Sequence, residues 1–212
     1  MQKHTNIAVI ESNWWRKSNT SVRGLFDLVA NIAFDNPNAY HYEMVNTEDA
    51  LKEVMPRIAS YREVQYACIA AHGDKDGIVF DLSGQRITRT EIRNLLCKIK
   101  ETNGSTLRGI HFSSCSFGTS GLAKHLFEKD VCINWVSGYE KDVSWIDSSA
   151  LDLLFFNELL QGKKDEKPRD AIVRTAKRVK ARASGLCKEL GFGIFVKNSG
   201  SGLQNLLAGA EQ

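Results

Sequence analysis

Short apolar runs alternate along the chain with longer segments in which apolar residues recur at helical spacing. The short runs are rich in Val and Ile and are typical of buried strands, whereas the longer segments are typical of helices with one apolar face. Strands are predicted at residues 6–10, 40–45, 64–71, 107–113, 131–137 and 191–196, and helices at 22–34, 47–60, 88–99, 121–128, 148–160 and 168–184. This alternation indicates an α/β fold, with a mainly parallel sheet covered by helices on both faces.

Turn and capping residues support several of these boundaries. Ser83-Gly84 stands between two short apolar runs within residues 77–87, a pattern that predicts a small β-hairpin. Thr88 and Glu91 then form a capping box at the start of the next helix.

No internal repeat or domain boundary is visible in the sequence. Pro168 suits the first turn of the last helix, and Gly185 is placed to end it. We therefore expect a single domain over residues 1–198 and a flexible tail of small residues at 199–212.

Composition narrows the class of protein. No run of about eighteen apolar residues occurs, so no transmembrane segment is expected. The first residues lack the apolar stretch of an export signal. Five cysteines without a CxxC pair favour neither a disulfide framework nor a structural zinc site. We expect the protein in a reducing cytoplasm.

Two of the predicted strands end abruptly at reactive side chains. The run 66–71 is followed by His72 and Gly73, and the run 107–113 leads to Cys115 among small hydroxyl residues. The carboxyl ends of parallel strands meet at one edge of a sheet, which is where ligands bind in open α/β folds. A thiol and an imidazole that meet there form a cysteine nucleophile with its general base.

Each of these residues also has a structural interpretation. Cysteine is among the most buried residue types, and core packing is favoured for the four that lie inside apolar or helical patterns, Cys68, Cys97, Cys132 and Cys187. Cys115 differs because it stands where a strand stops. The glycine after His72 would let a substrate approach the backbone. His111 shares a strand face with Cys115 and is a rival base, although burial in mid-strand favours a structural role.

Apolar runs that end in His72-Gly73 and in Ser114-Cys115 resemble the two catalytic blocks of caspase-like cysteine peptidases. Cys115 stands 43 positions after His72 (115 minus 72), close to the roughly fifty of caspases, whose signature around the cysteine is absent here. The chain is more similar to the CHAT branch, the separase-related proteases of bacteria. Further similar segments are 77–96, 145–160 and 191–196.

This resemblance implies a caspase-like three-layer sandwich and a cysteine protease without a metal or an organic cofactor. It implies that Cys115 is the nucleophile, that His72 is the base, and that the backbone amides of Gly73 and Cys115 form the oxyanion hole. CHAT proteases often belong to bacterial defence systems, so an antiviral role is implied as well. Many carry repeat or sensor domains, and these 212 residues contain none. Regulation would then come from a protein partner, or be absent.

A specificity pocket is implied in the segment 136–147, which resembles a stretch of metacaspases where an acidic residue receives Arg or Lys. This segment contains Glu140, Asp142 and Asp147, and its only base is Lys141. A carboxylate can hold a guanidinium through two parallel hydrogen bonds. We therefore expect cleavage after a basic residue. Asp142 is favoured as the receptor, because Asp147 can instead cap the following helix.

Aromatic and basic residues supply weaker candidates. Trp14, Trp15 and Trp145 are candidates for pocket walls, with core packing the alternative for each. The helix 168–184 is rich in Arg and Lys, a pattern that can bind phosphate. A solvated face is favoured, because apolar residues already give this helix a buried stripe. With a formal net charge of only +3, neither nucleic acid nor a membrane is an expected partner.

Three functions remain open at this point. The leading hypothesis is an endopeptidase that cleaves a protein substrate with a Cys115–His72 dyad. The alternative is a catalytically silent scaffold of the same fold that binds a regulatory partner. A flavodoxin-like binding module, the third hypothesis, would leave Cys115 and His72 apart.

Overall fold

The computed structural model describes residues 7–13, 21–79, 84–102, 104–162, 166–198 and 202–208. Within them, the strands of the main sheet are β1 (Ile7–Glu11), β2 (His41–Met44), β3 (Tyr66–Ala70), β7 (Gly109–Ser113), β8 (Trp135–Tyr139), β9 (Phe192–Lys197) and β10 (Leu203–Asn205). A small second sheet contains β4 (His72–Gly73), β5 (Gly77–Val79) and β6 (Arg86–Thr88). The helices are α1 (Arg23–Phe34), α2 (Glu48–Ala59), α3 (Arg89–Glu101), α4 (Ser120–Phe127), α5 (Trp145–Leu160) and α6 (Pro168–Leu190).

The main sheet has the strand order β10-β9-β8-β7-β3-β1-β2. Strands β8, β7, β3, β1 and β2 run parallel to one another. Strands β9 and β10 are antiparallel to their neighbours. The predicted α/β fold with a mainly parallel sheet is therefore confirmed, and β7 lies at its centre.

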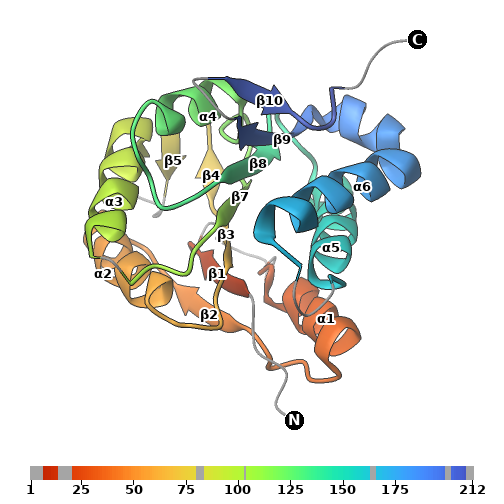
Figure 1. Ribbon diagram of the computed structural model, residues 1–212, viewed down its shortest axis with the longest axis horizontal. Coiled ribbons are helices and arrows are strands. Elements are labelled where there is room, and N and C mark those ends of the chain that lie inside the picture. The colour runs from red at the N-terminus through yellow and green to blue at the C-terminus, as the bar shows by residue number, and fades with distance from the viewer. Residues whose placement is uncertain are drawn as a thin grey trace.

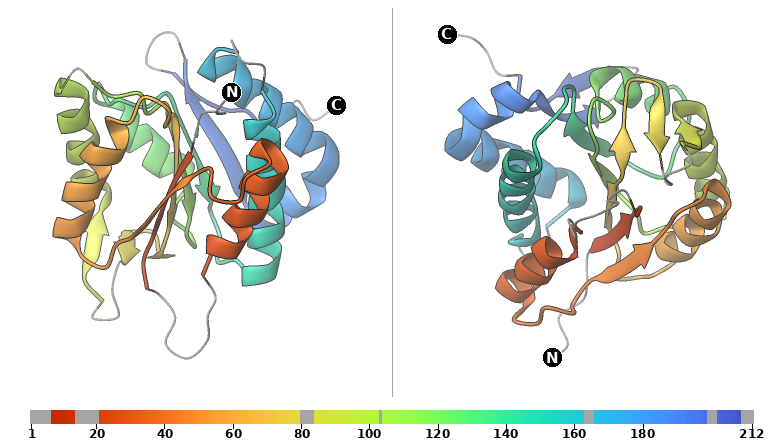
Figure 2. Two further views of the ribbon diagram at one scale, coloured as in Figure 1. Left: turned by 90° about the horizontal axis from the view of Figure 1, so that it is seen from below. Right: turned by 180° about the vertical axis from the view of Figure 1, so that it is seen from behind.

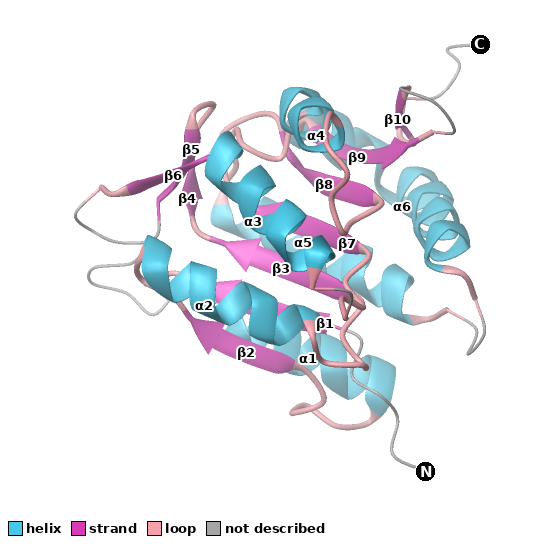
Figure 3. Cartoon of the chain, turned by 60° about the vertical axis from the view of Figure 1, so that its left-hand side comes forward, coloured by secondary structure: helices cyan, strands magenta, loops and turns pink. Residues whose placement is uncertain are grey.

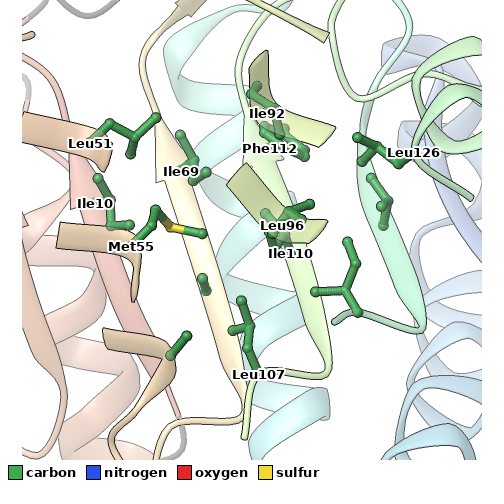
Figure 4. Packing of buried hydrophobic residues seen from close by; sticks show 14 of the residues in the cluster. Ile10, Leu51, Met55, Ile69, Ile92, Leu96, Leu107, Ile110, Phe112 and Leu126 are labelled. Carbon is green, nitrogen blue, oxygen red and sulfur yellow. The ribbon is translucent and has the colours of Figure 1, made fainter. Parts of the chain in front are cut away.

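Helices cover both faces of this sheet, as the sequence pattern predicts. Helices α2, α3 and α4 pack on one face, and α1, α5 and α6 on the other (Figure 1, Figure 3). Figure 4 shows Ile10 and Ile69 of the sheet against Leu51 and Met55 of α2. Each large apolar side chain buried in this way stabilises the fold by about 1.5–3 kcal/mol. The protein therefore has three layers, with the sheet in the middle and one apolar core on each of its faces.

The small sheet leaves the main one at the carboxyl end of β3. The predicted hairpin is present as β5 and β6, which pair antiparallel, and β4 pairs with β5 (Figure 2). The predicted capping box is also present: the Thr88 hydroxyl accepts from the Glu91 amide, and the Glu91 carboxylate accepts from the Thr88 amide.

The last helix is longer than the sequence suggests. We expected Gly185 to end it, but α6 continues to Leu190 through a kink at Ala183 and ends at Gly191, whose φ is 63°. A glycine inside a helix costs only about 1 kcal/mol. The buried side chains of Cys187 and Leu190 provide enough apolar contact to continue the helix beyond it.

Two further boundaries differ from expectation. The strand expected at 131–137 is β8, which extends to the buried Tyr139. The flexible tail expected from residue 199 is wrong for Leu203–Asn205, because these residues pair with β9 as β10. A short polar segment at a sheet edge has little hydrophobic pattern, and its pairing depends on backbone hydrogen bonds that a sequence does not display.

Candidate active site

The parallel pairing of β3 with β7 brings the two predicted catalytic residues together. Ala70 pairs with Ser113. His72 and Cys115 each follow two residues later, at matching positions beyond the ends of these strands (72 − 70 = 115 − 113). The two residues that a flavodoxin-like module would leave apart thus follow the ends of neighbouring strands.

Gly73 lies directly against the backbone that carries the cysteine. A Cβ atom added to Gly73 would stand 2.7 Å from the carbonyl oxygen of Cys115 and 2.9 Å from the Cβ of Ser114. Such an approach is possible only for a residue without a side chain. Pairing of His72 with Val79 in the small sheet holds this histidine–glycine segment in place.

The acidic residues after Gly73 build the adjacent loop. One oxygen of Asp74 accepts from the amides of Asp76 and Gly77, and the other accepts from Arg86 at 2.5 Å. Asp74 thus supports the turn into β5.

The sulfur of Cys115 contacts the loop that precedes α5. Cys115 is half-buried, and its Sγ accepts from the amide of Val143 at 3.5 Å. The next residue, Ser116, has a φ of 53°, a conformation rare for residues other than glycine. Its amide donates to the carbonyl of Lys141 at 3.0 Å, and its hydroxyl donates to Asp142 at 2.9 Å. The turn at Cys115 and Ser116 is thus bound along one side by residues 141–143.

The predicted pocket residues differ in their surroundings. Asp142 is exposed and bonded to the residue that follows Cys115. Asp147 lies in the first turn of α5, and its carboxylate accepts from the hydroxyl of Ser144 at 2.5 Å. Ser144, not Asp147, is the N-cap, since its hydroxyl accepts from the Asp147 amide. Trp145 is partly buried against the core on the α5 side. The candidate wall residues Trp14 and Trp15 lie outside the described residues.

A buried polar network lies beneath the cysteine strand. His111 is fully buried, with Nδ1 2.9 Å from the Ser137 hydroxyl and Nε2 2.9 Å from a carboxylate oxygen of Asp152. The Nε2 contact has the length of an ion pair without the alignment of a hydrogen bond. Asp152 also accepts from Ser113 at 2.6 Å and from Tyr139 at 2.5 Å. Burial raises the pKa of Tyr139, so its hydroxyl stays protonated and donates.

This network supports the structural role expected for His111. Its ring is enclosed by aromatic side chains and is not exposed at the edge where Cys115 lies. Asp152 was not recognised from the sequence. The sequence does show an acidic residue directly after the buried Leu151 within an apolar helix, and such a residue indicates a buried polar contact.

The five cysteines are free thiols with different surroundings. Burial raises the pKa of Cys68 well above its ordinary value, and raises those of Cys132 and Cys187 to about 11. Cys97 and Cys115 are only partly buried. In the described part of the chain, no group of three or more His, Cys, Asp or Glu residues is arranged to hold a metal ion.

These differences predict which thiols react with iodoacetamide. The thiolate is the reactive form, so Cys68, Cys132 and Cys187 should stay unmodified in the native protein near pH 7.5, while Cys97 and Cys115 are modified. Labelling of Cys132 and Cys187 should rise only as the pH approaches about 11. Peptide mapping by mass spectrometry measures this. Modification of Cys68 at neutral pH in a folded sample would contradict it.

Comparison with known proteins places the fold. No protein-family model and no curated protein matches the chain. A secreted C11 cysteine protease from Bacteroides thetaiotaomicron, solved with an irreversible peptide inhibitor, has a similar structure, with a TM-score of 0.55 and 10% sequence identity. The match covers 92% of this chain and 66% of that protease, so the chain spans slightly less than two thirds of its length. A second structure, of the C11 protease iotapain from the same organism, has a TM-score of 0.47 at 10% identity and covers 92% and 67%. The fold is therefore caspase-like and resembles that of C11 cysteine proteases.

Proposed function

We propose that this chain is a cysteine endopeptidase with Cys115 as nucleophile and His72 as general base. The observation that carries the proposal is the matching position of the two residues beyond β3 and β7, with Gly73 packed against the Cys115 carbonyl. The likeness to the fold of a C11 protease agrees with it. Internally quenched peptides incubated with wild type and Cys115→Ala test it.

The proposed reaction follows from these groups. His72 takes the proton from the Cys115 thiol, and the sulfur attacks the scissile carbonyl carbon. The oxyanion that forms accepts hydrogen bonds from the backbone amides of Gly73 and Cys115. The imidazolium then gives its proton to the leaving amine, which leaves an acyl-enzyme. Water activated by His72 hydrolyses the thioester and restores the thiol.

A finer family assignment and a biological setting belong to the same proposal. The His-Gly and Ser-Cys blocks and the helix that begins at Trp145 favour the CHAT branch among caspase-like proteases. This branch suggests a role in bacterial defence and a protein partner that regulates cleavage. The alternative, a silent scaffold that binds such a partner, predicts no turnover of any peptide.

The proposed cellular compartment rests on the free thiols. Free cysteines throughout the chain fit a reducing compartment, and we propose the cytoplasm on this ground, although the similar protease is a secreted protein. No helix in the described segments is both long and apolar enough to span a bilayer.

Cleavage after a basic residue is the proposed specificity. Asp142 is exposed beside the nucleophile turn, where its carboxylate can meet a substrate cation. Lys141 donates its ammonium protons to the carbonyls of Lys188 and Glu189 at the end of α6. The ammonium group of the only base in this segment is thus bonded to carbonyls at the end of α6. Asp147 is a weaker candidate, because it lies within the first turn of α5, where both its carboxylate and its amide are bonded to Ser144.

Asp142→Ala should lower kcat/KM for peptides with Arg before the cut by about 10- to 100-fold, since a charge-assisted pair is worth about 1.5–3 kcal/mol. Peptides with an uncharged residue there should lose less, because for them only the Ser116–Asp142 hydrogen bond is removed. A peptide library varied at this position, with Asp147→Ala as the matched control, measures the effect. Preference for Asp, or a basic preference unaffected by either variant, would show this assignment to be wrong.

A further inference from the structure

We infer that Lys141 is a positioning residue, which fixes the nucleophile turn of Cys115 and Ser116 by anchoring the loop beside it to the C-terminal end of α6. The inference rests on the proposed function and deepens it, because it identifies what holds the nucleophile in place. The loop concerned joins β8 to α5 and comprises Glu140–Val143, here called the 140–143 loop.

On one side, three successive residues of the 140–143 loop form hydrogen bonds with the nucleophile turn of Cys115 and Ser116. The amide of Ser116 donates to the Lys141 carbonyl, the hydroxyl of Ser116 donates to Asp142, and the amide of Val143 donates to the Cys115 sulfur. Ser116 adopts a left-handed backbone conformation, which costs roughly 1–2 kcal/mol for a residue with a side chain. Such a conformation persists only where surrounding contacts impose it, and here the 140–143 loop supplies them.

On the other side, the 140–143 loop is bound to the scaffold. The Lys141 ammonium donates to the carbonyls of Lys188 at 3.1 Å and Glu189 at 2.8 Å. These carbonyls belong to the last turn of α6, where the helix dipole favours a cation. The Glu140 amide also donates to the carbonyl of Gly191 at 2.9 Å.

Close packing at the helix end leaves little freedom for this arrangement. A Cβ atom on Gly191 would stand 3.1 Å from Cγ of Lys141 and 3.3 Å from Cβ of Glu140. The Glu140 carboxylate in turn accepts from the amide of Ser120 at the start of α4. Helices on both faces of the sheet thus hold the 140–143 loop (Figure 1), and Lys141 is the residue that binds α6 with its side chain and Ser116 with its backbone.

Hydrogen bonds thus connect the end of α6 through Lys141 to Ser116, the residue after the proposed nucleophile. A displacement of about 1 Å at a reacting group can cost as much as a hundredfold in rate. Removing the ammonium should therefore slow the chemical step, while binding of a peptide with an uncharged residue before the cut, which does not use Asp142, changes little.

The experiment compares Lys141→Met, Lys141→Arg and Lys188→Met. Met keeps most of the length of the lysine side chain without its charge, and Arg keeps the donors. Lys188→Met is the matched control, since it removes an exposed lysine from the same helix end but leaves the Lys188 carbonyl in place. The readouts are kcat and KM for a peptide with an uncharged residue before the cut, and hydrogen exchange of the segment 113–119 measured by mass spectrometry.

For Lys141→Met we expect kcat to fall by about 10- to 100-fold at nearly constant KM, with faster exchange in 113–119. Lys141→Arg should keep most of the wild-type kcat and of the wild-type protection from exchange, and Lys188→Met should match wild type in both measurements. Unchanged exchange in Lys141→Met, or an equal loss in Lys188→Met, would overturn the inference. The exchange measurement needs no peptidase activity, so an inactive wild type with the predicted exchange pattern would count against the proposed function and not against this connection.

Discussion

Cys115→Ala and His72→Ala should each abolish peptide cleavage, with a loss of at least about a thousandfold in kcat/KM, while the fold is retained. Losses of this size are usual when one member of a nucleophile–base pair is removed. Cys115 is only half-buried and His72 is exposed. Each substitution should therefore change the free energy of unfolding by no more than about 1 kcal/mol. Initial rates on quenched peptides and thermal unfolding of the same samples measure the two effects.

Two controls make this result specific. Cys97→Ala removes another partly buried thiol, on α3 and away from the sheet edge, and should keep full activity. His111→Ala should lower the free energy of unfolding by about 3 kcal/mol, because it leaves a cavity among buried aromatic side chains beside Asp152. Substantial activity in Cys115→Ala would refute the assignment. An inactive but folded His111→Ala, together with an active His72→Ala, would make His111 the base.

Gly73→Ala should reduce kcat by about a hundredfold, since the added methyl group must displace the Cys115 backbone on which the geometry of the site depends. The new atom would stand 2.7 Å from the Cys115 carbonyl oxygen, and the Cβ of Phe117 lies only 3.2 Å away. Two strand ends paired within the sheet cannot separate without cost, so a lower melting temperature should accompany the loss of activity.

Gly185→Ala is the matched control for this substitution. Nothing lies within 4 Å of a Cβ atom there, and in a helix the exchange should stabilise the protein by up to about 1 kcal/mol. Cleavage rates and melting temperatures of Gly73→Ala and Gly185→Ala, compared with wild type, test this prediction. If Gly73→Ala keeps wild-type activity, Gly73 does not shape the site and its proposed part in the oxyanion hole fails.

The edge of the sheet could be predicted because its determinants are local. The run 66–71 before His72 is continuously apolar, as a buried parallel strand requires, and Leu107, Ile110 and Phe112 supply the apolar positions of the run before Cys115. Parallel strands bring their carboxyl ends together. The resemblance to caspase-like peptidases pointed to the same pair of residues. The match to a C11 protease supports the caspase-like fold, while the residue pair and the CHAT assignment stay proposals.

The supporting contacts could not be predicted, because they join residues distant in sequence and leave no periodic signal. Lys141 meets the carbonyls of Lys188 and Glu189 only after α6 has continued through Gly185. Asp152 meets Ser113 only after α5 has packed on β7. The N-cap of α5 could not be predicted for a related reason. Both Ser144 and Asp147 are good capping residues, and the backbone conformation before α5 makes Ser144 the N-cap.

The central claim is that Cys115 is a nucleophile served by His72, and labelling by a peptide that carries a thiol-reactive ketone after an Arg residue tests it most directly. Intact-mass measurement followed by peptide mapping locates the adduct. The proposed site predicts one adduct per chain, on Cys115, formed rapidly by wild type, slowly by His72→Ala and not at all by Cys115→Ala. No adduct on folded wild type, or an adduct on Cys97 in place of Cys115, would contradict it.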